Sequence, residues 1–154
     1  MERGISVIFR FLPALFTAAL FCVPSPVRAG ERVVLVTSER CTVSRLTSLD
    51  LRKIYFGFTI EHDHQIIRAY RNLSDARLEQ IFLQNVVAMS KKSYRRRLLW
   101  LRLNNGNANV DEFKTVQEFL ADLDNWPCAI TYLWERQITP SSPLKILDGL
   151  WQSD

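Results

Sequence analysis

Three polar residues near the middle of the chain are arranged as a small anion site would require. Arg71, Ser74 and Arg77 fall where a short apolar strand is expected to pass into a helix. The free N–H groups and the positive end of a helix attract an anion, and arginine and serine side chains can donate further hydrogen bonds to it. The same residues also fit a plain helix cap at Ser74 or Asp75, with two solvated arginines beside it. Both interpretations predict a helix that begins at this turn.

A second polar segment carries four consecutive potential metal ligands. Alternate residues of an extended segment point to the same side, so two of the four could face one ion. A metal site also needs ligands that converge from other directions and supporting contacts around them. We therefore expect an ordinary charged connection and no bound metal. The segment consists of Glu61, His62, Asp63 and His64.

The chain shows no catalytic constellation. The two histidines, His62 and His64, lie in one connection, and no motif pairs either of them with a serine or cysteine nucleophile. Neither a G-x-S-x-G elbow nor a phosphate loop is present. The neighbouring carboxylates Asp122 and Asp124 follow an expected helix end and fit ordinary helix termination. The sequence predicts a protein that is not an enzyme and has no cofactor.

The N-terminal segment 1–29 has the features of a secretory signal peptide. Two arginines precede an apolar run over residues 11–23, and the segment ends on a Val-x-Ala pattern at Ala29. The run is shorter than the ~20 residues that a membrane-spanning helix needs. We predict cleavage after Ala29, export to the periplasm, and a single domain over 30–154 that does not insert into the membrane.

The charge balance of residues 30–154 excludes one class of partner. The whole chain has 20 basic and 16 acidic residues, and removal of three basic residues and one acidic residue with 1–29 leaves 17 and 15, a net charge of +2. Nucleic-acid-binding domains usually carry a strong basic excess. We therefore expect no nucleic-acid partner.

Two cysteines remain after the expected cleavage, Cys41 and Cys128. An exported protein can form a disulfide, which would restrict the unfolded chain by about 4 kcal/mol through closure of a long loop. Two buried free thiols are the alternative, because an unpaired cysteine packs well as a small apolar residue. The sequence leaves both possibilities open.

Apolar periodicity predicts strands that alternate with helices. The run at 33–36 is continuously apolar and β-branched, which is typical of a strand buried on both faces of a sheet. Such alternation indicates the α/β class, with a three-layer-like sheet flanked by helices. The segment 58–65 is polar and broken and predicts no regular element. The expected strands cover 33–36, 66–71, 129–134 and 144–147.

Capping patterns mark the expected helices. Thr47 and Asp50 form a T-x-x-D box that starts a helix ending near Gly57, and Thr115 and Glu118 form a complete T-x-x-E box. A third helix follows the turn at Asn72 to Asp75, and a fourth begins near Ser90 and stops within 104–107. Apolar spacing assigns a core-facing side to these last two helices. That side comprises Leu78, Ile81, Phe82 and Met89 in the third and Tyr94, Leu98 and Leu101 in the fourth.

The helix that begins near Ser90 also carries a basic stripe. Such a stripe can face anionic lipid, polyphosphate or an acidic protein, or can be a solvated helix face. Leu99 and Trp100 interrupt the polar surface, which favours burial of part of this helix against a second surface. The stripe comprises Lys91, Lys92, Arg95, Arg96 and Arg102.

Several stretches together resemble the short phosphate-binding-protein-like domains, which are related to the periplasmic receptors of phosphate ABC importers. The most specific stretches are 51–57, which reads L-x-x-I-Y-x-G, and 127–132, which is similar to a P-G-A-I-G-Y strand. The strand that ends at Arg71 and the helical stretches 77–82 and 94–100 extend the likeness. The resemblance implies one lobe of a type II periplasmic binding protein, whose two lobes close over an oxyanion, with an ABC permease or a membrane sensor as partner.

The resemblance also implies an R-x-x-G-S-G-T-like anion-binding element at the turn after the second strand. This chain has Arg71-Asn72-Leu73-Ser74-Asp75-Ala76-Arg77 there, so the implied ligands are Arg71, Ser74 and Arg77. Asp75 introduces a carboxylate near the expected anion. Two functions follow as hypotheses: a solute-binding or sensing module for phosphate or another small oxyanion, and an accessory protein-interaction module that kept the scaffold and lost the site.

Overall fold

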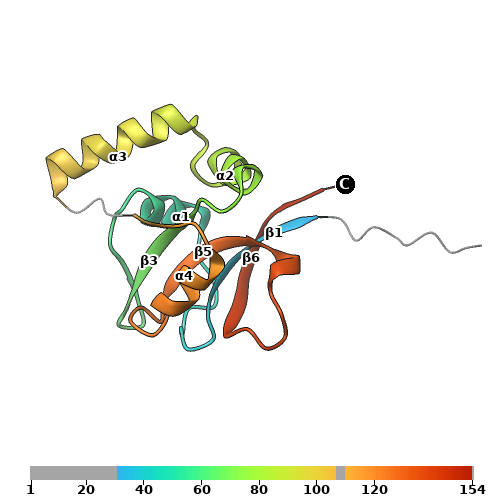
Figure 1. Cartoon of the computed structure of the whole chain (residues 1–154). Coiled ribbons are helices and arrows are strands. Elements are labelled where there is room, and N and C mark those ends of the chain that lie inside the picture. The colour runs from blue at the N-terminus through green and yellow to red at the C-terminus, as the bar shows by residue number, and fades with distance from the viewer. Residues whose placement is uncertain (1–30, 107–109, 154) are drawn as a thin grey trace, which may run out of the picture.

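The computed structural model describes residues 31–106 and 110–153, which form a mixed sheet with helices on both faces (Figure 1). The predicted signal peptide over 1–29 lies outside the described residues. The strands are β1 (Arg32–Ser38), β2 (Ile60–His62), β3 (Gln65–Asn72), β4 (Asp111–Phe113), β5 (Ala129–Trp134) and β6 (Leu144–Gln152). The helices are α1 (Ser48–Tyr55), α2 (Ala76–Phe82), α3 (Lys91–Asn105) and α4 (Val116–Asp122), with a π-helical turn η1 (Leu83–Val87) and a 3-10 turn η2 (Glu135–Gln137).

The sheet has the strand order β2-β3-β5-β1-β6, and β4 pairs with the end of β3. β1 is antiparallel to both β5 and β6, with Leu35 opposite Tyr132 in the β1–β5 register. β3 runs parallel to β5 and to β4. The parallel pairs place the C-terminal end of β3, where Arg71 lies, between two strands.

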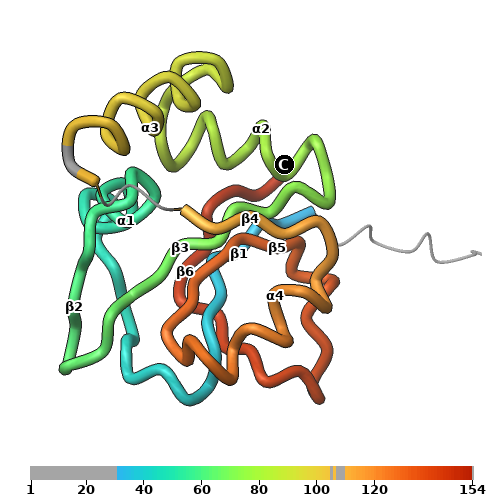
Figure 2. The backbone as a smooth tube through the Cα atoms, turned by 60° about the vertical axis from the view of Figure 1, so that its left-hand side comes forward, coloured from blue at the N-terminus to red at the C-terminus, as the bar shows by residue number. Residues whose placement is uncertain are grey.

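Alternate residues of the central strands build two separate cores. Leu35 and Tyr132 belong to the core under α1, α2 and η1, whereas Val34 and Leu133 belong to the core that also holds Phe119 of α4. Successive side chains of a strand point to opposite faces, so these apolar runs are buried on both sides. In Figures 1 and 2, α2 and α3 lie together on one side of the strands and α4 lies on the other. The predicted α/β class with a three-layer-like sheet is confirmed.

The residues at the ends of α1 and α4 form the caps that the sequence predicts. The Thr47 hydroxyl accepts a hydrogen bond from the N–H of Asp50 at 3.1 Å, and Gly57 adopts a left-handed φ of 80° just after the helix. Thr115 accepts from the N–H of Glu118 at 3.4 Å. These caps satisfy backbone donors that a helix start otherwise leaves free.

The prediction that 58–65 has no regular element is wrong. β2 and the start of β3 form a hairpin, in which Asp63 and His64 adopt φ values of 49° and 61°. Positive φ at both central residues is the mark of a two-residue type I′ turn, which matches the twist of the strands that it joins. Because β2 is a short edge strand of largely exposed residues, its sequence lacks the apolar alternation that reveals a strand.

The prediction that Met89 lies on the core face of a helix is also wrong. α2 passes into the π-helical turn η1, and the chain then takes a left-handed conformation at Ala88, with φ 53°. The π turn adds a residue to the helical repeat, and the left-handed residue ends the helix before Met89. Met89 is 37% exposed, whereas Leu78, Ile81 and Phe82 are buried as expected.

Candidate functional site

A cluster of four charged side chains lies at the C-terminal end of β3. The Arg71 side chain is only 2% exposed, and its Nη2 lies 2.7 Å from Glu79 Oε1 on α2. Its Nη1 donates to Glu112 Oε1 on β4. The second oxygen of Glu79, Oε2, accepts from Lys91 Nζ at the start of α3, at 2.6 Å. We call Arg71, Glu79, Glu112 and Lys91 the Arg71 cluster; it joins β3, β4, α2 and α3 and carries no net charge.

Aromatic rings line the Arg71 cluster on its core side. The Arg71 guanidinium lies 5.1 Å from the centre of the Tyr94 ring, a distance at which a cation is attracted to the ring face. The Tyr94 hydroxyl donates to the carbonyl of Tyr55, and the Tyr132 hydroxyl donates to the carbonyl of Asn72. Burial raises the pKa of both phenols above the ordinary value, although the positive charge of Arg71 opposes the increase. The two tyrosines therefore act as neutral donors.

Ser74 lies outside the Arg71 cluster and turns back on its own segment. Its N–H and its hydroxyl both donate to Asn72 Oδ1, at 2.9 and 2.6 Å. Asn72 is fully buried, and its Nδ2 donates to the carbonyl of Tyr132 at 3.1 Å. The Ser74 hydroxyl thus fixes the turn between β3 and α2.

Asp75 caps the start of α2. Its Oδ1 accepts from the N–H groups of Arg77 and Leu78 at 2.7 and 3.3 Å, and its Oδ2 accepts from Trp134 Nε1 at 2.9 Å. These donors, the Trp134 indole first among them, lower the pKa of the Asp75 carboxyl. The first N–H groups of the helix, which the resemblance assigns to an oxyanion, already have a carboxylate acceptor from the same chain.

Arg77 extends away from the other two implied ligands. Its Nη1 donates to Glu31, and its guanidinium lies 5.3 Å from the ring centre of Trp134. The Arg77 side chain is 53% exposed. Among the described residues, the side chains of Arg71, Ser74 and Arg77 share no hydrogen-bond partner. Arg71 donates to Glu79, Ser74 donates to Asn72, and Arg77 donates to Glu31.

The sequence did not reveal the two carboxylates that hold Arg71. Glu79 is 7% exposed and lies on the buried side of α2 with Leu78 and Phe82. The presence of an acid on this otherwise apolar helix face was the signal in the sequence that could have revealed it. Glu112 lies in the three-residue strand β4, which sequence reasoning did not predict. An acid on the core side of a helix indicates a buried cation opposite, because a buried charge without a partner is very costly.

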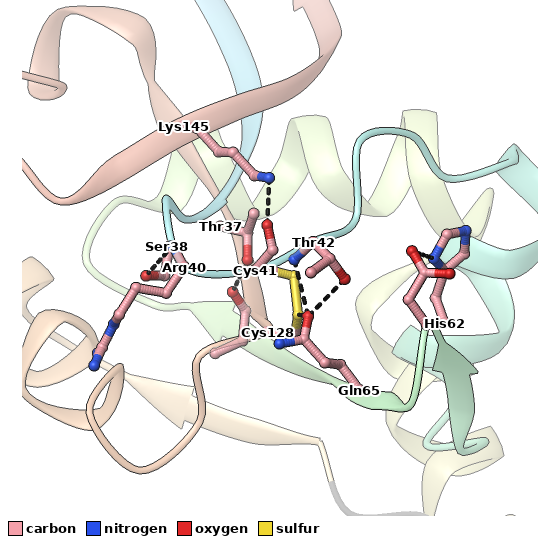
Figure 3. Close-up of a disulfide and its surroundings, with 11 residues drawn as sticks. Thr37, Ser38, Arg40, Cys41, Thr42, His62, Gln65, Cys128 and Lys145 are labelled. Carbon is pink, nitrogen blue, oxygen red and sulfur yellow. Dashed lines mark hydrogen bonds and ion pairs between the residues drawn. A yellow bond between two sulfur atoms is a disulfide. The ribbon is translucent and has the colours of Figure 1, made fainter.

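Cys41 and Cys128 are joined by a disulfide, with their Cα atoms 4.8 Å apart (Figure 3). The bond links the segment after β1 to the residue before β5. Beside it, the N–H and the hydroxyl of Thr42 both donate to Gln65 Oε1 at 2.8 Å, and Lys145 Nζ donates to the carbonyl of Cys41. Figure 3 shows these contacts gathered around the sulfur atoms, where they hold one end of the sheet together.

The four residues at 61–64 form two exposed local pairs. His62 Nδ1 lies 3.1 Å from Asp63 Oδ2, and His64 Nδ1 lies 3.6 Å from Glu61 Oε1. Over 31–106 and 110–153, no three histidine, cysteine or acidic side chains are gathered as a metal ion would require. In the same ranges, no helix combines the length and the apolar character needed to cross a bilayer.

An open cleft of about 450 Å³ lies between the end of α1 and strand β3, and Arg68 is the charged residue in its lining. The Arg68 guanidinium stacks over Trp126, 4.1 Å from the ring centre, and its Nε lies 2.8 Å from Asp111 Oδ2. This cation already has both an aromatic and an acidic partner. The cleft therefore offers no charged group free for a ligand within the described lining.

Comparison with known proteins finds a likeness of fold alone. No protein-family model and no curated protein matches the chain. An ABC-type phosphate transport receptor from Vibrio cholerae superposes with a TM-score of 0.55 at 12% identity, over 77% of this chain and 46% of that one. PstS from Borrelia burgdorferi superposes with a TM-score of 0.51 at 13% identity, over 77% of this chain and 47% of that one.

This chain therefore spans less than half the length of the two receptors and has a fold like that of periplasmic binding proteins. The coverage is consistent with one lobe of such a receptor. The likeness is one of fold, since identities of 12% and 13% carry no assignment of ligand or partner.

Proposed function

We propose that the chain is an exported, receptor-like accessory module that keeps one lobe of the periplasmic-binding-protein scaffold and acts through surface contacts. In this proposal the signal peptide over 1–29 directs export to the periplasm, and the domain over 30–154 does not close over an oxyanion. The observation that carries it is the state of Arg71, whose buried guanidinium already contacts two carboxylates, Glu79 and Glu112.

Electrostatics supports this proposal. An oxyanion that approached Arg71 would meet the negative charges of Glu79 and Glu112 at close range, and in a buried position such repulsion is weakly screened. At the start of α2, the Asp75 carboxylate accepts from the N–H groups that would otherwise bind an anion. Both arginines of the implied site and the first N–H groups of α2 thus have an acid of this chain as partner.

A second candidate function is weak binding of phosphate or another small oxyanion. Two observations favour it. The Glu112 side chain is 47% exposed, so it is the more easily displaced of the two carboxylates that contact Arg71, and Arg71 Nε is buried without a hydrogen-bond partner among the described residues. Phosphate is the first ligand to test, because one of the structurally similar proteins is a phosphate transport receptor. An ABC permease or a membrane sensor would be the partner of such a receptor.

Thermal unfolding with added phosphate separates the two functions. A ligand that binds the native state at 100 times its Kd stabilises the protein by about 2.7 kcal/mol, so a Kd of ~0.1 mM would be plain at ~10 mM phosphate. We expect no change in Tm with phosphate or sulfate. A rise in Tm that the Arg71→Met variant abolishes would overturn the accessory proposal and establish oxyanion binding.

The Glu112→Gln variant sharpens this experiment, with Glu118→Gln on the exposed surface of α4 as its matched control. If Glu112 stands where an anion would bind, its neutralisation lets phosphate raise the Tm, whereas Glu118→Gln leaves the Tm independent of phosphate. Export is tested separately by the intact mass of the protein from the periplasmic fraction, which we expect to begin at Gly30.

A further inference from the structure

Helix α3 differs from the rest of the protein in its charge. Over Lys91–Asn105 it carries six basic residues and no acidic residue. Residues 30–154 contain 17 basic and 15 acidic residues, so the remainder outside α3 has 11 against 15 and is net negative. The positive charge of this part of the chain is therefore concentrated in α3, and an anionic surface would attract it with α3 foremost. The six residues are Lys91, Lys92, Arg95, Arg96, Arg97 and Arg102.

Only one side of α3 packs against the body of the protein. Tyr94 and Leu101 are buried at 0% and 2% exposure, and Leu98 packs against the main core. In Figures 1 and 2, the helix runs along the outside of the molecule, and the other elements lie on its inner side. The side opposite Tyr94 and Leu101 therefore faces outward along the whole helix.

Large apolar side chains occupy the C-terminal half of this outward side. Leu99, Trp100 and Leu103 are 56%, 50% and 77% exposed. Lys92, Arg96, Leu99 and Leu103 follow each other at helical spacings of four, three and four residues, which places them in one row. The outward face, which we define by Lys92, Arg96, Leu99, Trp100 and Leu103, thus begins basic and ends apolar.

We infer that this outward face of α3 binds the surface of an anionic phospholipid bilayer. The inference rests on the proposed function, because it names the surface through which the accessory module makes contact. Basic residues attract lipid phosphates, and leucine and tryptophan side chains enter the boundary between headgroups and acyl chains. The long arginine stems can cover apolar surface while their charged ends stay with the phosphates. A helix of 15 residues, about 22 Å long, lies flat in that boundary.

The shape of the surface favours a membrane over a protein. Leu99 and Leu103 are exposed on the outward face of α3, and a soft bilayer can close around such side chains, whereas a protein partner would need a complementary groove. An open groove on α3 meets this row at Arg96 and is lined by Met89, Ser93, Arg96, Arg97 and Trp100. A second copy of the chain is disfavoured, because two outward faces would oppose basic residues if parallel and would cover basic residues with apolar side chains if antiparallel.

Vesicle co-sedimentation tests the charge requirement. The protein is purified in the form that accumulates in the cell, and its N-terminus is established by intact mass. It is mixed with vesicles of pure phosphatidylcholine or with vesicles of phosphatidylcholine and phosphatidylglycerol. We expect binding that needs phosphatidylglycerol and weakens with salt. Because each basic residue near an anionic surface adds about 1 kcal/mol, Lys92→Gln with Arg96→Gln should lower the partition coefficient at least tenfold. Arg45→Gln with Lys53→Gln, exposed but off α3, is the matched control.

A second pair of variants tests the apolar contribution. Leu103→Ala removes a 77%-exposed leucine from the outward face, and Leu49→Ala removes a 62%-exposed leucine from α1. We expect several-fold weaker vesicle binding for Leu103→Ala only. Because both side chains are exposed, neither variant should lower the Tm, so a failure to fold cannot imitate the result.

Two outcomes would overturn this inference. One is binding to phosphatidylglycerol vesicles that the α3 variants leave unchanged. The other is binding of an acidic peptide such as poly-glutamate, but not of vesicles, that the α3 variants abolish; the outward face would then serve an acidic protein. Neither result depends on the phosphate experiment, in which a ligand-dependent Tm would overturn the proposed function instead.

Discussion

Arg71 Nη2 and Glu79 Oε1 form an ion pair of 2.7 Å in the protein interior, with side chains 2% and 10% exposed. Removal of two charges from water is costly, so such a pair persists only where both members keep close partners. Glu112 supplies the second partner of Arg71, and Lys91 supplies that of Glu79. The pair thereby joins α2 to β3 and reaches both β4 and the first turn of α3.

We predict that Arg71→Met destabilises the protein by about 3 kcal/mol, because it leaves Glu79 buried with only Lys91 beside it. The measurement is the free energy of unfolding in urea. Arg77→Met is the matched control: Arg77 pairs with Glu31 at the surface, and its loss should cost under about 1 kcal/mol. Equal losses in the two variants would contradict a buried role for Arg71. Addition of Glu79→Gln to Arg71→Met should recover part of the loss, since the unpaired acid is then gone.

The disulfide between Cys41 and Cys128 closes a loop with a sequence separation of 87. We predict that Cys41→Ser with Cys128→Ser lowers the free energy of unfolding by about 2–5 kcal/mol, because the unfolded chain regains the freedom that the bond removes. The pairing is checked by proteolysis without reductant, which should give one peptide that contains both cysteines and separates on reduction. Two separate peptides carrying free thiols would establish the alternative.

Elements whose signals are local were predictable from the sequence. The hydroxyl of Thr47 and the left-handed Gly57 mark the ends of α1 through contacts within a few residues, and the apolar runs at 33–36 and 129–134 require burial on both faces. In each case, satisfaction of backbone N–H groups or burial of apolar area leaves few alternatives. Such elements were enough to predict the α/β class with a sheet flanked by helices.

The environment of the implied anion site could not be predicted in the same way. Arg71 contacts Glu112, which is 41 residues away in the sequence. Glu112 lies in the three-residue strand β4, and β4 is stabilised by its pairing with β3. The helical segment that begins with α2 ends through a π-helical turn and a left-handed Ala88. An alanine in the sequence does not indicate a left-handed conformation. Contacts between distant segments and strained single residues depend on the finished tertiary structure, which local patterns do not encode.

The Asp75 cap predicts a dependence of stability on pH. Hydrogen bonds from Trp134 and from the start of α2 lower the folded-state pKa of the carboxyl below its unfolded value of about 3.9. A lowered carboxyl pKa gives stability that is complete above the unfolded value and is lost as pH falls through the folded value. We therefore predict that the difference in unfolding free energy between wild type and Asp75→Asn shrinks as pH falls from about 6 to about 3. Asparagine also caps helices through its one oxygen, so the variant keeps a cap but removes the charge together with the second acceptor that the Trp134 indole uses.

Trp134→Phe is the companion variant for the same measurement. It keeps an aromatic ring at 134 and removes the indole N–H that donates to Asp75 Oδ2. Because this donor is the largest cause of the lowered pKa of Asp75, the variant should show a flatter decline of stability in acid than wild type. An unchanged pH profile would mean that the Asp75 carboxylate is not held by the indole in solution.

Ala88 adopts a left-handed conformation with φ 53° at the end of η1, where its N–H donates to the carbonyl of Leu83. The left-handed conformation costs an L-residue roughly 1–2 kcal/mol of conformational energy and costs glycine almost none. Glycine also makes the unfolded chain more flexible, which offsets part of this gain. We predict that Ala88→Gly raises the free energy of unfolding by up to about 1 kcal/mol, measured in urea. Ala121→Gly, inside α4, is the matched control and should lower it by about 1 kcal/mol, since the backbone there is right-handed. Equal losses in the two variants would contradict the left-handed conformation of Ala88 between η1 and the Ser90 cap of α3.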